Sequence, residues 1–307
     1  MDSESSYSYH WEKELAFSGS MSLPAQIESW MHEAISLLGS SLQHQLQQAA
    51  THRVLTVSGW NSSSAIRQAI GRYLVGLRIC AIDAALSIRA EIADTDRGRL
   101  ELRQNVYAII GEHPNSLSAD LIRTSRNPWI AEGLWHLCLV VARHTVPLHP
   151  PGPVVAVNLP HPKPSDHGID VAVLYRIGDA FGFSIIESKA YPNNVGNAVQ
   201  NSIVFFREVD NGTHALRIRQ VISVMRAQLE QRDQDRISQT LWQERRTYFC
   251  NPHYDAQHAP NWTNPRPALA ALVPGADGVF LMPHSIQSFD VFFENISAEM
   301  RAAVVSI

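Results

Sequence analysis

The sequence predicts an α/β protein in which a central mixed sheet is flanked by helices. The segment 129–142 is apolar nearly all round, as in a helix that is buried on every side. Three strand-like runs follow it, at 154–159, 169–176 and 181–188. Gly178-Asp179 separates the last two runs and predicts a hairpin. A buried helix, a hairpin and later helices together favour a layered α/β or α+β core.

The remaining elements follow from the spacing of apolar residues. Apolar residues at steps of three and four predict helices at 25–48, 65–92, 99–110, 197–209, 214–230 and 289–305. The segment 278–282 is a candidate for a late strand. Ser62–Ser64 offer N-caps for the second helix. We therefore divide the chain into a flexible arm (1–24), a helical region (25–115) and a domain that carries the chemistry (116–307).

Composition limits the classes of function. The 307 residues carry a net charge of −4, so any nucleic-acid binding must use a local patch. Three distant cysteines argue against a disulfide framework and for a reducing compartment, the cytoplasm. No apolar run reaches the length of a membrane span, and the chain has no phosphate-binding or dinucleotide-binding glycine loop.

One lysine is the most informative residue of the chain. Of 25 Lys and Arg residues only three are lysine, and Lys189 lies inside an apolar strand, two residues after Glu187. Alternate residues of a strand share a face, so Glu187 and Lys189 point the same way and Ser188 the other. Asp170 begins the neighbouring strand, where the hairpin brings it alongside.

These side chains predict a metal site. Two adjacent carboxylates repel each other unless a cation joins them, and Mg²⁺ or Mn²⁺ with oxygen ligands suits Asp170 and Glu187. The carbonyl of Ser188 could add a ligand, and Lys189 could orient or deprotonate a water. Glu132 is an acidic residue in the most apolar helix, and glutamate is rarely buried without a partner or a metal. It is the candidate for a further carboxylate.

This order of residues resembles the PD-(D/E)xK nuclease superfamily, although Ile169 replaces the proline of the motif. The resemblance implies a restriction-endonuclease-like core and places metal-binding and catalytic roles on Glu132, Asp170, Glu187 and Lys189. The stretches His167-Gly168-Ile169-Asp170 and Glu187-Ser188-Lys189-Ala190-Tyr191 are similar to the nuclease subunit of Hachiman-type bacterial anti-phage systems. That similarity implies a DNA-directed nuclease with a helicase or ATPase partner.

Weaker signals concern contacts to nucleic acid. His167 lies just before the aspartate, Gln200 on the following helix, and Arg219 and Arg226 share a face of the next helix. Gln200 is a candidate because the resemblance implies a glutamine or similar residue on that helix. His167 fits a nucleic-acid contact or a polar loop residue, and the two arginines fit phosphate contacts or a solvated helix with internal ion pairs.

Other readings of the sequence stay open. Cys250, His253 and His258 suit zinc by type, but a closed zinc site needs four ligands. Two alternatives to a nuclease remain: an inactive nuclease-fold subunit that binds nucleic acid or a partner, and a metal-dependent phosphoesterase acting on a small molecule.

Overall fold

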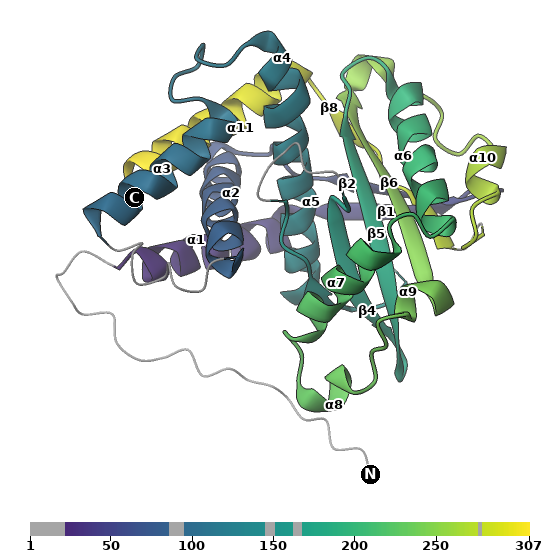
Figure 1. Cartoon of the computed structure of the whole chain (residues 1–307). Coiled ribbons are helices and arrows are strands. Elements are labelled where there is room, and N and C mark those ends of the chain that lie inside the picture. The colour runs from purple at the N-terminus through teal and green to yellow at the C-terminus, as the bar shows by residue number, and fades with distance from the viewer. Residues whose placement is uncertain (1–21, 86–94, 145–150, 162–167, 276–277) are drawn as a thin grey trace.

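The computed structural model describes residues 22–85, 95–144, 151–161, 168–275 and 278–307. A curled mixed sheet runs through the molecule with helices on both faces (Figure 1). The α/β class predicted from the sequence is therefore confirmed, whereas a PD-(D/E)xK core stays a prediction. In the described part of the chain, no helix has the length and apolarity needed to cross a membrane.

The sheet has parallel strands at its centre and antiparallel strands at both edges. In the described residues its order is β1-β2-β7-β6-β5-β4-β3, and β8 also pairs with β6. The bounds are β1 (Gln43–Gln48), β2 (Arg53–Ser58), β3 (Val154–Val157), β4 (Val171–Ile177), β5 (Ala180–Ala190), β6 (Arg246–Asp255), β7 (Val279–Leu281) and β8 (His284–Ile286). Strands β5, β6, β7 and β2 run parallel, and the β4–β5 hairpin is antiparallel.

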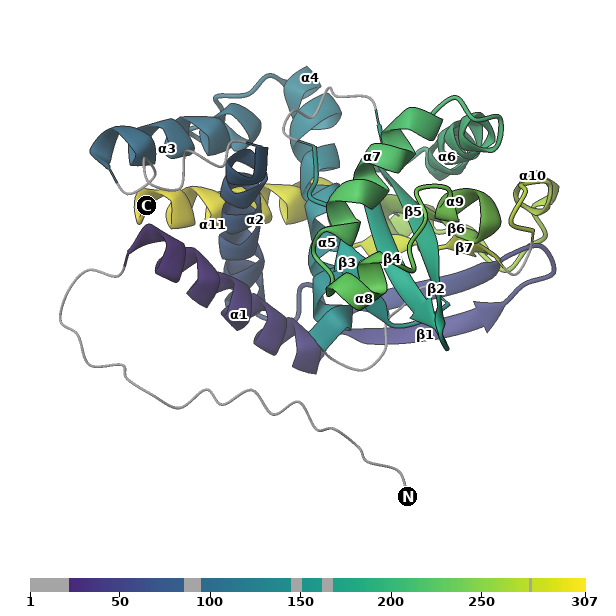
Figure 2. The same ribbon diagram turned by 60° about the horizontal axis from the view of Figure 1, so that its bottom comes forward.

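Five longer helices cover one face of the sheet: α1 (Leu23–Ser41), α2 (Ser64–Ala85), α3 (Asp96–Ile110), α5 (Asn127–His144) and α11 (Phe289–Val305). Figure 2 shows them gathered on the side away from α6. Helix α5 lies innermost and buries Trp129 and Trp135 almost completely. This position explains why its sequence is apolar nearly all round.

The other face is covered by α6 (Val195–Asp210) and α7 (Ala215–Arg226), whose apolar sides pack on β4, β5 and β6. Short helical turns complete the chain: α4 (Ala119–Leu121), η1 (Ile122–Arg126), α8 (Gln231–Gln234), α9 (Leu241–Glu244), η2 (Ala256–His258) and α10 (Pro267–Ala270). The strand ends that lie between α5 and α6 are therefore the part of the sheet where a site can form.

The predicted hairpin is confirmed. Strands β4 and β5 join through Gly178 and Asp179, and Gly178 has φ +55°, a conformation that glycine adopts without a steric penalty. The predicted helix 289–305 matches α11, and the predicted late strand matches β7 within a residue at each end.

The expectation that 25–115 is purely helical is wrong. The helix predicted at 25–48 ends at Ser41, and β1 and β2 follow as a hairpin. Strand β1 is exposed along its whole length and Gln-rich, so it lacks the alternation that marks a half-buried strand. Strand β2 pairs with β7, so this region contributes to the main sheet. The boundary at residue 115 stays a prediction, and most of the arm 1–24 lies outside the described residues.

Candidate active site

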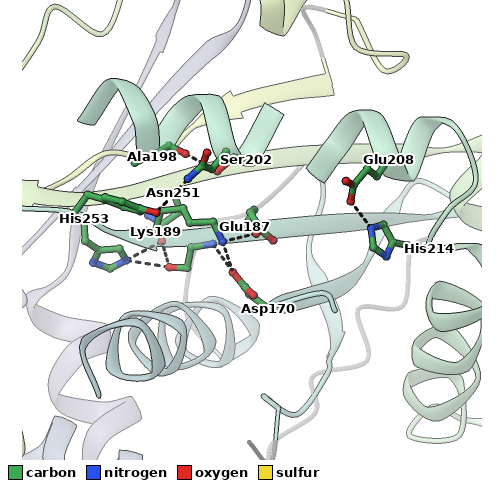
Figure 3. A network of polar contacts seen from close by, with 12 residues as sticks. Asp170, Glu187, Lys189, Ala198, Ser202, Glu208, His214, Asn251 and His253 are labelled. Carbon is green, nitrogen blue, oxygen red and sulfur yellow. Dashed lines mark hydrogen bonds and ion pairs between the residues drawn. The ribbon is translucent and has the colours of Figure 1, made fainter. Parts of the chain in front are cut away.

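The β4–β5 hairpin brings Asp170 and Glu187 together. Val171 pairs with Ile186, so Asp170, one residue before β4, lies opposite Glu187. The backbone N–H of Ser188 donates to Asp170 Oδ2 at 2.9 Å and holds this carboxylate against β5 (Figure 3). The hairpin register inferred from the sequence therefore places these carboxylates as expected.

Strand alternation separates Ser188 from its two neighbours. Phe183 and Ile185 pack in the layer of α6, whereas Ile186 and Ala190 pack in the layer of α5. Glu187 and Lys189 therefore face the α6 side of the sheet, and the side chain of Ser188 faces α5. Figure 3 shows Lys189 reaching toward both Glu187 and Asp170.

Lys189 is the cation of the cluster. Its ammonium pairs with Glu187 and lies 3.7 Å from Asp170 Oδ2. Burial lowers the pKa of Lys189, but the charges of Glu187 and Asp170 more than reverse this and hold the pKa above its ordinary value. Lys189 is thus protonated at neutral pH and neutralises the carboxylates beside it.

Glu132 joins the cluster from α5. Strand β3 ends at Val157, which pairs with Val173, so no described strand separates Asp170 from α5. Glu132 is buried and lines the same cavity as Asp170, Glu187 and Lys189. Burial, with the charge of Asp170 next, raises the pKa of Glu132 well above its usual range. The four predicted side chains therefore meet at one place.

Glu187 also holds its proton more tightly than an exposed glutamate. Burial, then the charge of Asp170, raises its pKa to about 8, while the Lys189 ammonium opposes the shift. Burial thus favours protonation of both Glu187 and Glu132, and the Lys189 ammonium opposes it. A bound divalent cation would favour the deprotonated carboxylates, since metal ligands must be deprotonated.

The cluster has the donor set that a hard cation needs. Glu187 Oε2 is buried and has no hydrogen-bond partner among the described residues. In that part of the chain, no three His, Cys, Asp or Glu side chains are arranged as a complete metal site. Mg²⁺, however, is commonly held by one or two carboxylates with water. Asp170 and Glu187, with the Ser188 carbonyl, fit a site of that kind.

The cavity at the cluster has a volume of about 610 Å³. One wall comes from η1 and the start of α5, with Arg123, Thr124 and Pro128. A second wall comes from the end of α6 and the turn that follows, where His214 Nε2 lies 2.9 Å from Glu208 Oε2. Figure 3 shows this pair to one side of Lys189. Neither wall could be predicted from the sequence, because the two come from segments far apart in the chain.

A second polar layer lies behind the cluster on the α5 side. Ser188 Oγ donates to Asn251 Oδ1 at 2.7 Å and lies 3.2 Å from His253 Nε2. Trp135 Nε1 contacts the same histidine nitrogen at 3.1 Å, and His284 Nδ1 lies 3.0 Å from His253 Nδ1. Burial lowers the pKa of His253 well below its usual value, so it is neutral. This layer fixes Ser188 between the two site residues.

Three predicted nucleic-acid contacts do not line the cavity. Gln200 and Arg219 are exposed on α6 and α7, and Arg226 is half-buried at the end of α7. They follow the site in sequence, but the helices turn them away from it. His167 lies outside the described residues.

The structure does not gather the candidate zinc ligands. Cys250 packs in the α6 layer, whereas His253, three residues later on β6, points to the α5 layer. His258 is exposed beyond the strand. These side chains therefore form no common site.

Comparisons with known proteins found no match: no family model, no curated protein and no solved structure is similar to this chain. The function must therefore be argued from the site itself.

Proposed function

We propose that the protein is a metal-dependent nuclease of the PD-(D/E)xK type that hydrolyses DNA phosphodiester bonds with Mg²⁺ or Mn²⁺. One observation carries the proposal: Asp170, Glu187 and Lys189 meet at a cavity, with Glu132 beside them. This set of groups suits phosphodiester hydrolysis, which needs a metal ligand pair and a group that orients water.

Each side chain has a separate role in this proposal. Asp170 and Glu187, with the Ser188 carbonyl, would hold the ion, and Glu132 would complete the site. The ion, when bound, polarises the scissile phosphate and stabilises the leaving oxygen. Because its neighbours keep Lys189 protonated, it fits the role of orienting the attacking water better than that of removing its proton.

A cleavage assay tests the proposal. The purified chain, Glu187→Ala and Lys189→Ala are incubated with plasmid and linear DNA in Mn²⁺ or in EDTA. We expect Mn²⁺-dependent cleavage by the unchanged chain and by the control Arg97→Ala, and none by Glu187→Ala or Lys189→Ala, with every variant folded by circular dichroism. Arg97→Ala is the control, because Arg97 is exposed on α3 and lies outside the cavity. Equal cleavage by all four proteins would assign the activity to a contaminant or another site.

A second candidate is a nuclease-fold subunit without activity, which binds nucleic acid or a partner. The ion pair of Lys189 with both carboxylates favours it, since the ammonium already supplies the positive charge that a metal would bring. Metal binding separates the two candidates: an inactive subunit would show no Mn²⁺-dependent stabilisation.

We also propose that the chain works with a DNA-translocating partner in the cytoplasm, as an effector of anti-phage defence. The support is the resemblance noted above and a net charge of −4, which gives little long-range attraction to DNA. Co-expression with the neighbouring gene product and size-exclusion chromatography test this. A monomer that cuts DNA at full rate alone would contradict it.

A further inference from the structure

The basic side chains that line the cavity differ in what they already contact. Lys189 pairs with Glu187 and Asp170, and His214 contacts Glu208. Arg123 is the one arginine among the described lining residues. An entering phosphate needs a positive group, because the carboxylates of the cavity repel it. Arg123 is the candidate for this positive group, because it can bind the phosphate without first breaking a contact with the acid cluster.

The ion pair of Arg123 is easily exchanged. Its Nη2 lies 2.7 Å from Asp120 Oδ1, but the two side chains are 70% and 71% exposed. Exposed pairs of this kind contribute little to stability, so a phosphate can replace the carboxylate at little cost. Arginine also presents a planar set of donors that matches phosphate oxygens.

Arg123 lies in a π-helical turn. In η1 the N–H of Asn127 donates to the carbonyl of Ile122, five residues earlier. Pro128 follows and has no N–H to donate to Thr124, four residues before it, so the regular helical ladder is interrupted here. The Thr124 hydroxyl donates to the Asp120 carbonyl at 2.8 Å. Among the described residues the Arg123 guanidinium donates through Nη2 to Asp120, so its other N–H groups can serve a ligand.

Buried charges anchor the same turn to α11. Arg126, the last residue of η1, is buried and pairs with Glu294 of α11. Glu294 also pairs with Arg301, whose second guanidinium nitrogen donates to the Ile110 carbonyl at 3.1 Å. The turn is thus held from behind while Arg123 points outward. Such an arrangement presents a cation on a rigid wall.

We propose that Arg123 binds a backbone phosphate of the nucleic acid that enters the cavity. The proposal rests on the proposed function, because it assigns the substrate contact of that same site. It replaces Arg219 and Arg226, which lie outside the cavity, as the cationic contact.

DNA binding without cleavage tests the assignment. Fluorescence anisotropy of a labelled 20-base-pair duplex and of its single strand is measured in EDTA at several salt concentrations. Arg123→Gln should weaken binding of at least one probe by about 5- to 10-fold and lower the salt slope by about one, as expected for a lost phosphate contact. Arg97→Gln is the matched control, because Arg97 is also an exposed helical arginine paired with a nearby acid, Glu101.

The outcomes separate this inference from the proposed function. Unchanged affinity and salt slope in Arg123→Gln, for both probes, would overturn the inference even if the chain cuts DNA. An equal loss in Arg97→Gln would also overturn it, since the effect would then be one of net charge. Arg123-dependent binding without Mn²⁺-dependent cleavage would support the inference while the proposed nuclease activity failed.

Discussion

Lys189 Nζ lies 3.7 Å from Asp170 Oδ2 and also pairs with Glu187. The ammonium therefore contacts both of the carboxylates that we propose as metal ligands. This relationship makes the charge balance of the site depend on one lysine, and it leads to predictions about stability as well as activity.

Lys189→Met should lower the free energy of unfolding by about 1–3 kcal/mol, because Asp170 and Glu187 lose their cation in a site that is largely buried. Mn²⁺ should restore more stability to this variant than to the unchanged chain, since the ion replaces the missing charge. Thermal unfolding with and without MnCl₂ measures both effects. The idea fails if Mn²⁺ shifts the two proteins equally.

Glu187→Gln should abolish the Mn²⁺-dependent rise in melting temperature. It should also reduce cleavage by more than about 100-fold, because loss of a residue that only hydrogen-bonds to a metal ligand typically costs about 10- to 100-fold. The amide keeps the size of the side chain but cannot carry the ligand charge. Melting temperature in EDTA serves as the control for folding. A full Mn²⁺ response in this variant would remove Glu187 from the metal site.

Asn251→Ala should lower the free energy of unfolding by about 1–3 kcal/mol, because it takes the acceptor Oδ1 from Ser188 Oγ and the donor Nδ2 from the Met282 carbonyl. Cleavage should fall by about 10- to 100-fold as Ser188 loses its position between Glu187 and Lys189. Asn251→Asp, which keeps the acceptor for Ser188, should recover part of the rate. If Asn251→Ala cuts DNA at the full rate, this layer serves stability alone.

Acid should destabilise the fold through His136 of α5. Burial lowers its folded-state pKa from 6.5 to about 4, and Nδ1 lies 2.8 Å from the Tyr73 hydroxyl. Above pH 6.5 His136 is neutral in both the folded and the unfolded state, and it does not change stability. Below pH 6.5 the unfolded state binds a proton on His136 that the folded state does not, so the free energy of unfolding falls until about pH 4. The loss at pH 5 is about 2 kcal/mol.

Urea unfolding at pH 7.5 and pH 5 measures this loss. His136→Gln should reduce the difference between the free energies of unfolding at the two pH values, because glutamine keeps a polar partner for Tyr73 without titrating. An identical pH dependence in variant and unchanged chain would assign the acid sensitivity to other groups, such as His284, whose pKa burial lowers to about 3.

The sequence predicted the acid cluster because its signal is local. Asp170, Glu187 and Lys189 lie on two strands of one hairpin, and strand alternation alone decides which side chains share a face. Glu132 could be found as well, because a carboxylate in an apolar helix needs a partner. In contrast, β6 was missed because Pro252 interrupts it, and proline usually marks an edge strand.

The structure explains why proline is tolerated there. Pro252 pairs with Lys189 on the β5 side, while β7 pairs with β6 only up to Cys250 and β8 only from His253. Pro252 thus lies in the gap between two short neighbours. Without β6, the layer of Asn251 and His253 behind Ser188 could not be predicted. The wall that carries Arg123 depends on long-range packing against α11, so it could not be predicted from the sequence either.

The most direct test of the account is a crystal structure with Mn²⁺, examined by anomalous scattering. We expect one anomalous peak at about 2.1–2.2 Å from oxygens of both Asp170 and Glu187, a distance typical of a small hard cation. Lys189 Nζ should have moved away from the space between them. A structure at high Mn²⁺ concentration without such a peak, in which Lys189 still pairs with both carboxylates, would contradict the central claim.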